Sequence, residues 1–236
     1  MFFDYQGAIS FEEYKNVNCS AEAFNEYLLN HTRNRRQSDT QQDDLMNHLL
    51  TYCDDKGKLT DDEVVSLCAM LFGVGQETAG NLIGNGVLAL LEHPKQLDML
   101  KQQTVSLADA VEEMGRFDTP VQFITRETRE DLTLGKHDIP AGSTIFLSLA
   151  AANRDPKRYA NADSFDITRG LKHTLPYGSG RHYCLGAALA RIVNEEAIRF
   201  IVSLDNVVAI SESQVRRKSM IIRSLLSFPI SFTPVN

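Results

Sequence analysis

The stretch Tyr177–Gly186, which reads YGSGRHYCLG, decides how the 236-residue sequence is interpreted. Its glycines alternate with polar residues, and Cys184 stands where an amphipathic helix is predicted to begin. Backbone N–H groups and the positive end of a helix favour a thiolate, which is either a nucleophile or a metal ligand. The stretch therefore predicts that Cys184 carries the chemistry of the protein.

Two interpretations of this cysteine follow from its neighbours. A nucleophile needs a base within reach, and His182 is close in sequence, although residues two apart at the entry to a helix point in different directions. The glycines at 178, 180 and 186 suit a different need, a backbone that passes close to a flat ligand. Both interpretations remain open on these residues alone.

A long helix is predicted upstream. Thr60–Glu63 has the form of a capping box, apolar residues recur at helical spacing as far as Leu90, and Pro94 ends the pattern. This gives about 32 residues, or roughly 48 Å. Glycines and the stretch Gly75–Thr78 (GQET) interrupt the pattern, and two interpretations are equally good. Either a bulky flat group approaches the backbone, or the helix packs closely on another helix and Glu77 faces solvent.

The remaining elements are predicted from periodicity and turn residues. Glu113 and Arg116 lie three apart, a spacing that alone indicates an ordinary surface ion pair. No regular structure is expected over 153–183. Helices are predicted over 21–36, 44–53, 94–103, 107–117 and after Gly186, and short strands over 121–125, 132–134, 144–147 and within 205–236.

Composition excludes several classes of protein. The formal charge is −7 and the basic clusters, 33–36 and 216–218, are short, so they are interpreted as solvated and nucleic acid is not expected as a partner. The four cysteines form no zinc pattern and are expected to be free thiols. No secretory signal and no apolar run long enough for a membrane are seen, so a cytoplasmic protein without membrane contact is expected.

Four motifs in order resemble those of one family. Tyr177–Gly186 resembles the haem-binding loop of the cytochrome P450 family, FGxGxHxCxG, with Tyr177 in place of the usual Phe. Gly75–Thr78 resembles the family's oxygen-activating stretch, Glu113–Arg116 (EMGR) its ExxR pair, and Ala152–Pro156 (ANRDP) a run common in bacterial members. The order and spacing make the resemblance specific.

The resemblance implies a mainly α fold with small β-sheets (α+β), built around the long central helix and the Cys184 loop. It covers residues 21–236, leaving residues 1–20 as an N-terminal segment of unassigned role. The chain is shorter than the family's domain, so a truncated fold that lacks the distal half is expected.

The family's roles transfer residue by residue. Cys184 would ligate the iron of haem b (iron protoporphyrin IX), donating electron density that favours O–O cleavage. Gly178, Gly180 and Gly186 would let the loop lie near the porphyrin, with Tyr177 at its start. In the central helix, Glu77 and Thr78 would relay protons and Gly75 would leave room for oxygen.

Other family positions concern the edge of the haem and the support of the loop. Arg126, His182 and His173 would meet the haem propionates. Glu113 and Arg116 would form a buried structural pair. The family completes that pair with an arginine before a phenylalanine, but here Ser164 precedes Phe165, so the third partner is not identified.

The resemblance implies a monooxygenase that uses O2 or peroxide to oxidise a small organic substrate, served by a ferredoxin-type electron donor. A homodimer or a partner chain is expected to cover the central helix, because its apolar face would otherwise be exposed. Two alternatives are a haem-binding accessory protein without catalysis and a haem-free remnant with an interaction role.

Overall fold

The chain is described by a computed structural model over residues 10–38, 42–54, 57–170, 174–210 and 214–233. It divides into two compact units, residues 1–76 and 77–236. The boundary lies inside the longest helix, α3 (Asp61–Glu92), whose 32 residues match the predicted length. Thr60 and Glu63 form the predicted capping box, because each side chain bonds the backbone N–H of the other.

The first unit holds α1 (Phe11–Gln37), α2 (Leu45–Thr51), β1 (Cys53–Asp54), β2 (Gly57–Lys58) and the beginning of α3. The prediction that the first helix starts at residue 21 is wrong: α1 starts at Phe11, because Ser10 and Glu13 form a capping box there.

Arg36, predicted to lie in a solvated basic cluster, has tertiary partners instead. Its Nε lies 2.5 Å from Oδ1 of Asp61, and Nη2 donates to the carbonyl of Leu59 at 2.8 Å. The solvated interpretation of this cluster is wrong for Arg36, because its guanidinium joins the end of α1 to the start of α3.

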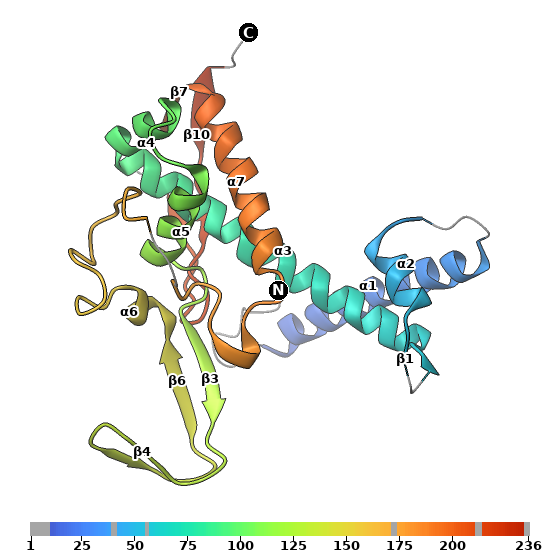
Figure 1. The fold of residues 1–236 in the computed structure, drawn as a ribbon. Helices are drawn as coiled ribbons and strands as arrows, with labels where there is room; N and C mark the ends of the chain where they lie inside the picture. Colours follow the sequence, from blue (N-terminus) through green and yellow to red (C-terminus); the bar gives the residue numbers. More distant parts are fainter. Residues whose placement is uncertain (1–9, 39–41, 55–56, 171–173, 211–213, 234–236) are drawn as a thin grey trace. The chain divides into compact units, whose positions relative to one another are not determined.

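The core of the second unit lies where four helices meet: the end of α3, α4 (Pro94–Lys101), α5 (Leu107–Phe117) and α7 (Ala187–Ser203). Both α4 and α5 contact α7 (Figure 1). The segment after α6 also contributes buried side chains. Fully or almost fully buried members of this core are Leu90, Ala110, Val111, Met114, Phe165, Ile167 and Ile198.

All strands of the second unit pair in antiparallel two-stranded ladders, which agrees with the predicted small sheets. β3 (Phe123–Glu127) pairs with β6 (Thr144–Ser148), and β4 (Leu132–Leu134) with β5 (His137–Ile139). β8 (Val215–Arg216) pairs with β9 (Leu225–Ser227), and β7 (Asp205–Ala209) with β10 (Ile230–Thr233). The short helix α6 (Leu149–Asn153) and strand β5 were not predicted.

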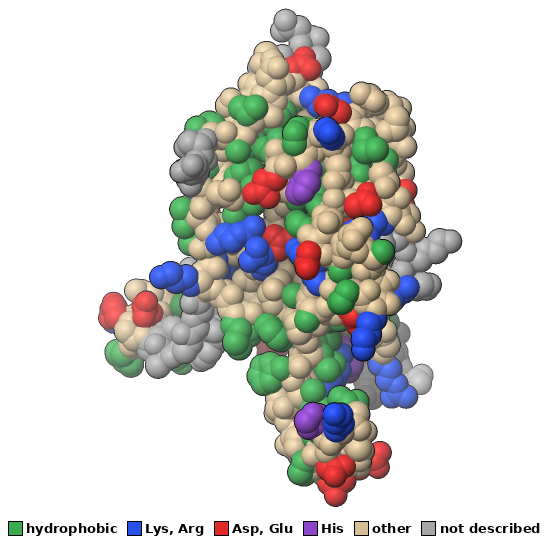
Figure 2. All heavy atoms as spheres, turned by 90° about the vertical axis from the view of Figure 1, so that its left-hand side faces the viewer, with side chains coloured by type: hydrophobic (Ala, Val, Ile, Leu, Met, Phe, Trp, Pro, Cys, Tyr) green, Lys and Arg blue, Asp and Glu red, His purple; other side chains and the backbone are tan. Residues whose placement is uncertain are grey.

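The surface of the molecule shows no gathering of one charge sign on the face seen in Figure 2, where acidic, basic and apolar side chains are interspersed. None of the described helices is long and apolar enough to cross a membrane.

Candidate functional site

Cys184 lies in an exposed loop directly before α7. Its backbone N–H donates to the carbonyl of Tyr177 at 3.0 Å, and its own carbonyl accepts from the N–H of Ala187. A 3-10 turn at Gly180–His182 leads into the loop. The backbone is therefore fixed on both sides of the cysteine, while the residue itself is exposed.

Two glycines of the loop adopt a conformation that favours glycine. Gly178 has φ +70° and Gly180 has φ +72°, which is the left-handed region. A side chain at Gly186 would meet no atom within 4 Å. A Cβ at Gly180 would likewise meet no atom of the described residues within 4 Å, so at these two positions the loop backbone is open to the approach of a flat group.

A cluster of polar side chains supports the loop from behind. Arg191 of α7 contacts Oε1 of Glu112 on α5 at 2.5 Å and donates to the hydroxyl of Tyr183 at 3.0 Å. Its guanidinium also lies 4.5 Å from the centre of the Tyr177 ring. On the other oxygen, Glu112 accepts a bond from the hydroxyl of Thr174 at 2.6 Å. Arg191 therefore ties the loop to both α5 and α7.

Tyr177 is the residue at which the loop departs from the family motif, and its hydroxyl is buried. Among the described residues this hydroxyl has no hydrogen-bond partner. Burial raises the pKa of Tyr177 to about 12, because a phenolate loses more hydration than a phenol. The ring of Tyr177 therefore has a contact, with the guanidinium of Arg191, whereas its hydroxyl has no hydrogen-bond partner among the described residues.

Glu113 and Arg116 lie together inside the unit. Arg116 Nε contacts Oε2 of Glu113 at 2.6 Å and Nη2 contacts Oε1 at 2.8 Å, and both residues are completely buried. The surface interpretation of the spacing is therefore wrong. Arg116 also donates to the carbonyls of Asn153, Ala162 and Ser164. A buried bidentate pair with its remaining donors satisfied keeps the irregular segment after α6 in place.

The third member of this pair is Arg169. Its Nε lies 3.4 Å from Oε1 of Glu113, and its other nitrogens bond the carbonyls of Ala160, Asn161 and Ser164. Asp166, whose backbone N–H donates to Glu113, has a pKa held below its usual value, first by the hydroxyl of Thr168. Arg169 stands five residues beyond Ser164, so the sequence motif did not identify it.

The central helix carries Gly75 in the first unit and Glu77 and Thr78 in the second. The Glu77 carboxylate is largely covered, and its Oε1 lies 2.6 Å from Nη1 of Arg217. The interpretation of Glu77 as a solvent-facing residue is therefore wrong. Thr78 is partly buried.

The close-packing interpretation of the helix glycines applies at Gly86. A Cβ at Gly86 would lie 2.6 Å from Sδ of Met114, so this glycine allows α3 and α5 to approach closely. At Gly75 and Gly80, a Cβ would meet nothing within 4 Å, which leaves the backbone accessible.

Of the residues expected at the haem propionates, Arg126 and His182 lie in the described part of the chain. Arg126 lies on β3 and donates to the carbonyl of Thr125 at 2.7 Å. His182 is exposed in the 3-10 turn, and within the described part of the chain no hydrogen bond joins it to Cys184. His173 lies outside the described residues.

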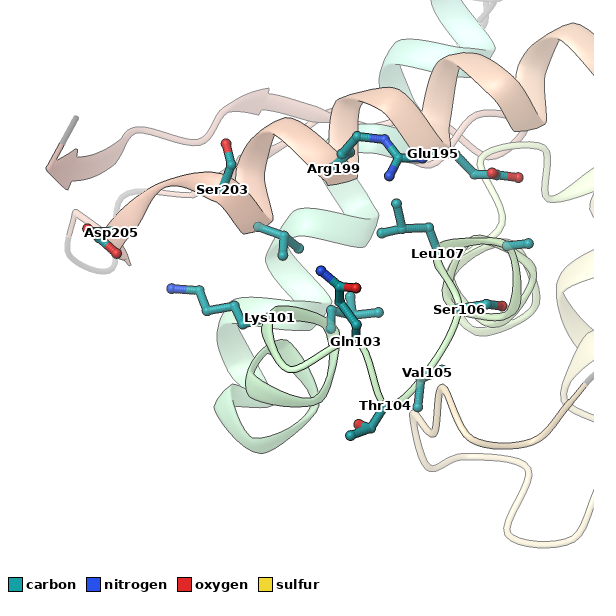
Figure 3. A pocket seen from close by; sticks show the side chains of 13 residues that line it. Lys101, Gln103, Thr104, Val105, Ser106, Leu107, Glu195, Arg199, Ser203 and Asp205 are labelled. Atoms are coloured by element: carbon teal, nitrogen blue, oxygen red, sulfur yellow. The ribbon is translucent and has the colours of Figure 1, made fainter. Parts of the chain in front are cut away.

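A hollow on the second unit lies away from these residues. It measures about 810 Å³ and is lined by the end of α4, the start of α5 and the end of α7, including Lys101, Ser106, Arg199 and Asp205 (Figure 3). Its lining includes neither Cys184 nor Glu77. Over the described residues, no three His, Cys, Asp or Glu side chains gather where they could hold a metal ion.

Comparison with known proteins identifies the fold. The model of the family "Cytochrome P450" matches residues 2–202. The chain belongs to the cytochrome P450 family. It is 41% identical over 201 residues to the vitamin D(3) 25-hydroxylase of Pseudonocardia autotrophica, covering 83% of this chain and 50% of the relative. It is 37% identical to the biotin biosynthesis cytochrome P450 of Bacillus subtilis, with 84% and 50% covered.

Solved P450 structures match over nearly the whole chain. CYP109Q5 from Chondromyces apiculatus superimposes with a TM-score of 0.86 at 34% identity, over 93% of this chain and 56% of that one. P450BioI, solved in complex with an acyl carrier protein bearing a fatty acid, gives 0.85 at 34% identity, over 96% and 58%. This confirms the predicted P450 fold. The chain spans about half the length of the curated relatives it matches.

Membership of the P450 family implies a haem cofactor, and the residues around Cys184 fit such a group. Cys184 is exposed, a Cβ at Gly180 or Gly186 would meet no atom of the described residues within 4 Å, and Arg191 joins the loop to α5 through Tyr183 and Glu112. A thiolate is the ligand type that P450 haem iron takes.

Proposed function

We propose that the chain binds haem b through the Cys184 thiolate and forms the haem-binding half of a P450 monooxygenase that oxidises a small organic substrate. The observation that supports this most strongly is the exposed thiol on a glycine-rich loop braced by Glu112 and Arg191. When bound, a haem with a thiolate ligand supplies O–O bond cleavage.

The chain's own residues have separate roles in this proposal. Gly178, Gly180 and Gly186 let the loop backbone lie near the porphyrin, and the ring of Tyr177 packs against Arg191 at the start of the loop. Glu77 and Thr78 hold and pass protons on α3, and Gly75 leaves room beside the helix backbone. Glu113 and Arg116 fix the segment that leads to the loop and carry out no chemistry.

Cations at the edge of the haem are the second part of the proposal. Arg126 and His182 are assigned to the propionates, together with His173. All three side chains provide N–H donors suited to carboxylates. A ferredoxin-type donor supplies electrons to the haem.

The names of the relatives suggest a substrate class. They include a vitamin D(3) hydroxylase, a biotin biosynthesis enzyme and a polyketide biosynthesis enzyme. We propose an apolar small molecule of secondary or cofactor metabolism as the substrate. P450BioI was solved with an acyl carrier protein, so a substrate tethered to a carrier protein is one form that this proposal includes.

We further propose that a second copy or a partner chain covers the apolar surface of α7. The prediction of exposed apolar residues on the central helix applies to its start, where Met70 and Phe72 are exposed, whereas its end is buried in the core. The larger apolar surface lies on and before α7, where Leu185, Leu189, Ile192, Val193 and Phe200 are exposed. Size-exclusion chromatography with light scattering tests this, and a monodisperse monomer at micromolar concentration contradicts it.

Haem binding is tested by the absorbance of the reduced, CO-treated chain after reconstitution. We expect the spectrum of a thiolate-ligated ferrous–CO complex in the wild type and its complete loss in Cys184→Ala. Cys19→Ala is the matched control, since it removes another exposed cysteine and should leave the spectrum unchanged. A wild-type chain that takes up no haem contradicts the proposal.

A further inference from the structure

The C-terminal hairpin formed by β8 and β9 carries three arginines, and all of them contact acidic side chains. Arg216 Nη2 lies 3.3 Å from Oδ2 of Asp118, the residue that ends α5, and Arg223 contacts the other oxygen of the same carboxylate. Arg217 contacts Glu77 on α3 at 2.6 Å. Of the basic cluster 216–218, which was predicted to be solvated, Arg216 and Arg217 instead contact acidic groups, whereas Lys218 is exposed.

Backbone contacts hold this hairpin in place without any help from Arg217. The N–H of Gln122 donates to the carbonyl of Ile221 at 2.8 Å, and the N–H of Arg223 donates to the carbonyl of Pro120 at 2.7 Å. Ile222 between them is completely buried. The chain segment that bears Arg217 is therefore anchored to the strand region after α5.

Side-chain contacts join the hairpin to α3 as well. The amide of Asn85 donates to the carbonyl of Arg223 at 3.1 Å, and Leu225 lies 3.7 Å from the position of a Cβ at Gly84. The N–H of Arg217 donates to the carbonyl of Ser224 at 3.0 Å, which fixes its backbone across the hairpin. Arg217 thus reaches Glu77 from a preorganised position, which lowers the conformational entropy lost when the pair forms.

The pair is more sheltered than an ordinary surface ion pair. The Glu77 and Arg217 side chains are 18% and 24% exposed, whereas those of Glu196 and Arg199 on α7 are 62% and 60% exposed. Partial removal from water strengthens the attraction between the charges. A contact of 2.6 Å is typical of a charge-assisted hydrogen bond, which also fixes the direction of the carboxylate.

We propose that Arg217 is the positioning residue for the Glu77 carboxylate, holding it against the C-terminal hairpin so that the acidic group has one defined place on α3. This inference rests on the proposed function, in which Glu77 and Thr78 handle protons. It adds that the hairpin sets the position of the Glu77 carboxylate. A change at Arg217 or a displacement of the hairpin therefore releases Glu77 from that position.

A thermal unfolding cycle on the whole chain without haem tests whether the pair forms. Glu77→Gln and Arg217→Gln should each lower Tm by about 2–4 °C, and the double variant should lose no more than the larger single loss. Arg217→Lys, which keeps the charge, should recover most of the loss. Additive losses in the double variant would overturn the proposal.

Turnover of the haem-loaded chain tests whether the position matters, with hydrogen peroxide as oxidant and guaiacol as the probe. Arg217→Gln should lower kcat about tenfold or more with little change in KM, because a misplacement of about 1 Å can cost about 100-fold. Arg217→Lys should restore most of kcat. Arg199→Gln is the matched control, because it removes the same charge from an exposed pair and should change neither constant.

The two measurements separate the proposals. A wild-type chain without the thiolate-type CO spectrum contradicts the proposed function, while the unfolding cycle still decides whether Arg217 positions Glu77. If haem is bound and Arg217→Gln keeps the kcat of Arg199→Gln, or lysine fails to rescue it, the positioning role is wrong.

Discussion

The buried pair at Glu113 and Arg116 and the exposed loop at Cys184 belong to the same unit but differ in how completely the chain satisfies them. Arg116 is fully buried and makes five hydrogen bonds, all within the chain. Cys184, in contrast, is an exposed free cysteine. The comparison shows a buried ion pair that is satisfied within the chain beside an exposed cysteine that we propose as the haem ligand.

The largest loss of stability is expected from breaking the buried pair of Glu113 and Arg116. Arg116→Leu leaves the buried Glu113 carboxylate without its bidentate partner and removes the side-chain donor from the carbonyls of Asn153 and Ala162. Removing one partner of a buried pair costs about 3–5 kcal/mol. Urea unfolding of the apo chain should show this as a lower midpoint, and an unchanged midpoint would mean that the pair does not support the fold. Cys184→Ala, in contrast, should leave the midpoint nearly unchanged.

A second effect tests how closely the helices behind the pair approach one another. Gly86→Ala places a Cβ 2.6 Å from Sδ of Met114, which is itself buried, and should cost about 1–3 kcal/mol in the free energy of unfolding. Gly80→Ala is the matched control in the same helix. It meets no neighbour, so higher helix propensity should stabilise the chain by about 1 kcal/mol. Equal effects at the two positions would disprove close packing at Gly86.

The supporting side of the loop offers a third test, at Tyr177. Its buried hydroxyl has no partner among the described residues, so Tyr177→Phe should stabilise the chain by about 1 kcal/mol. This would show that the Tyr177 hydroxyl lacks a hydrogen bond, whereas the guanidinium of Arg116 is fully bonded. A destabilised variant would indicate that the hydroxyl has a partner after all.

The same variant should alter the response to alkaline pH. The folded-state pKa of Tyr177 is raised to about 12, above the value of about 10 for an unfolded tyrosine. A raised pKa contributes stability that is complete below about pH 10 and is lost as pH rises towards 12. The advantage of Tyr177→Phe over the wild type should therefore widen across this range, as measured by urea unfolding at about pH 9 and pH 11.5.

The smallest effect is expected at the surface of α7. Arg199 and Glu196 form an exposed pair at 3.3 Å, so Arg199→Gln should change the free energy of unfolding by less than about 1 kcal/mol. If Arg199→Gln lowered the free energy of unfolding as much as Arg116→Leu, buried and exposed ion pairs would not differ in their contribution to stability.

The fold could be predicted where local signals are strong. The capping box at Thr60 and the proline at 94 determined both ends of α3, because these signals act within a few residues. The start of α1 at Phe11 was missed although Ser10 and Glu13 carry the same signal, since the apolar spacing that follows them is weak. Strand β5 was missed because its three residues are defined by pairing with β4.

The candidate site could be predicted only as far as its motifs extend. Cys184, Glu77 and the pair Glu113–Arg116 stand in motifs and were found. The arginines that hold them were not, because Arg169 and Arg217 meet their acidic partners across 56 and 140 residues of sequence. The signal that could have suggested Arg217 is the density of basic residues at 216–218 in an acidic chain.

The contacts of Arg191 and Glu112 that support the Cys184 loop affect the order in which the chain folds. Glu112 and Arg191 are 79 residues apart, and the hydroxyl of Thr174 donates to Glu112 across 62 residues. Long loops must close before such contacts stabilise anything, which slows folding. During synthesis, α5 emerges before α7, so Glu112 has no Arg191 to bind until α7 has followed. A nascent chain that contains Cys184 but not yet Arg191 cannot form this support, so the Cys184 loop gains it only once α7 has been synthesised.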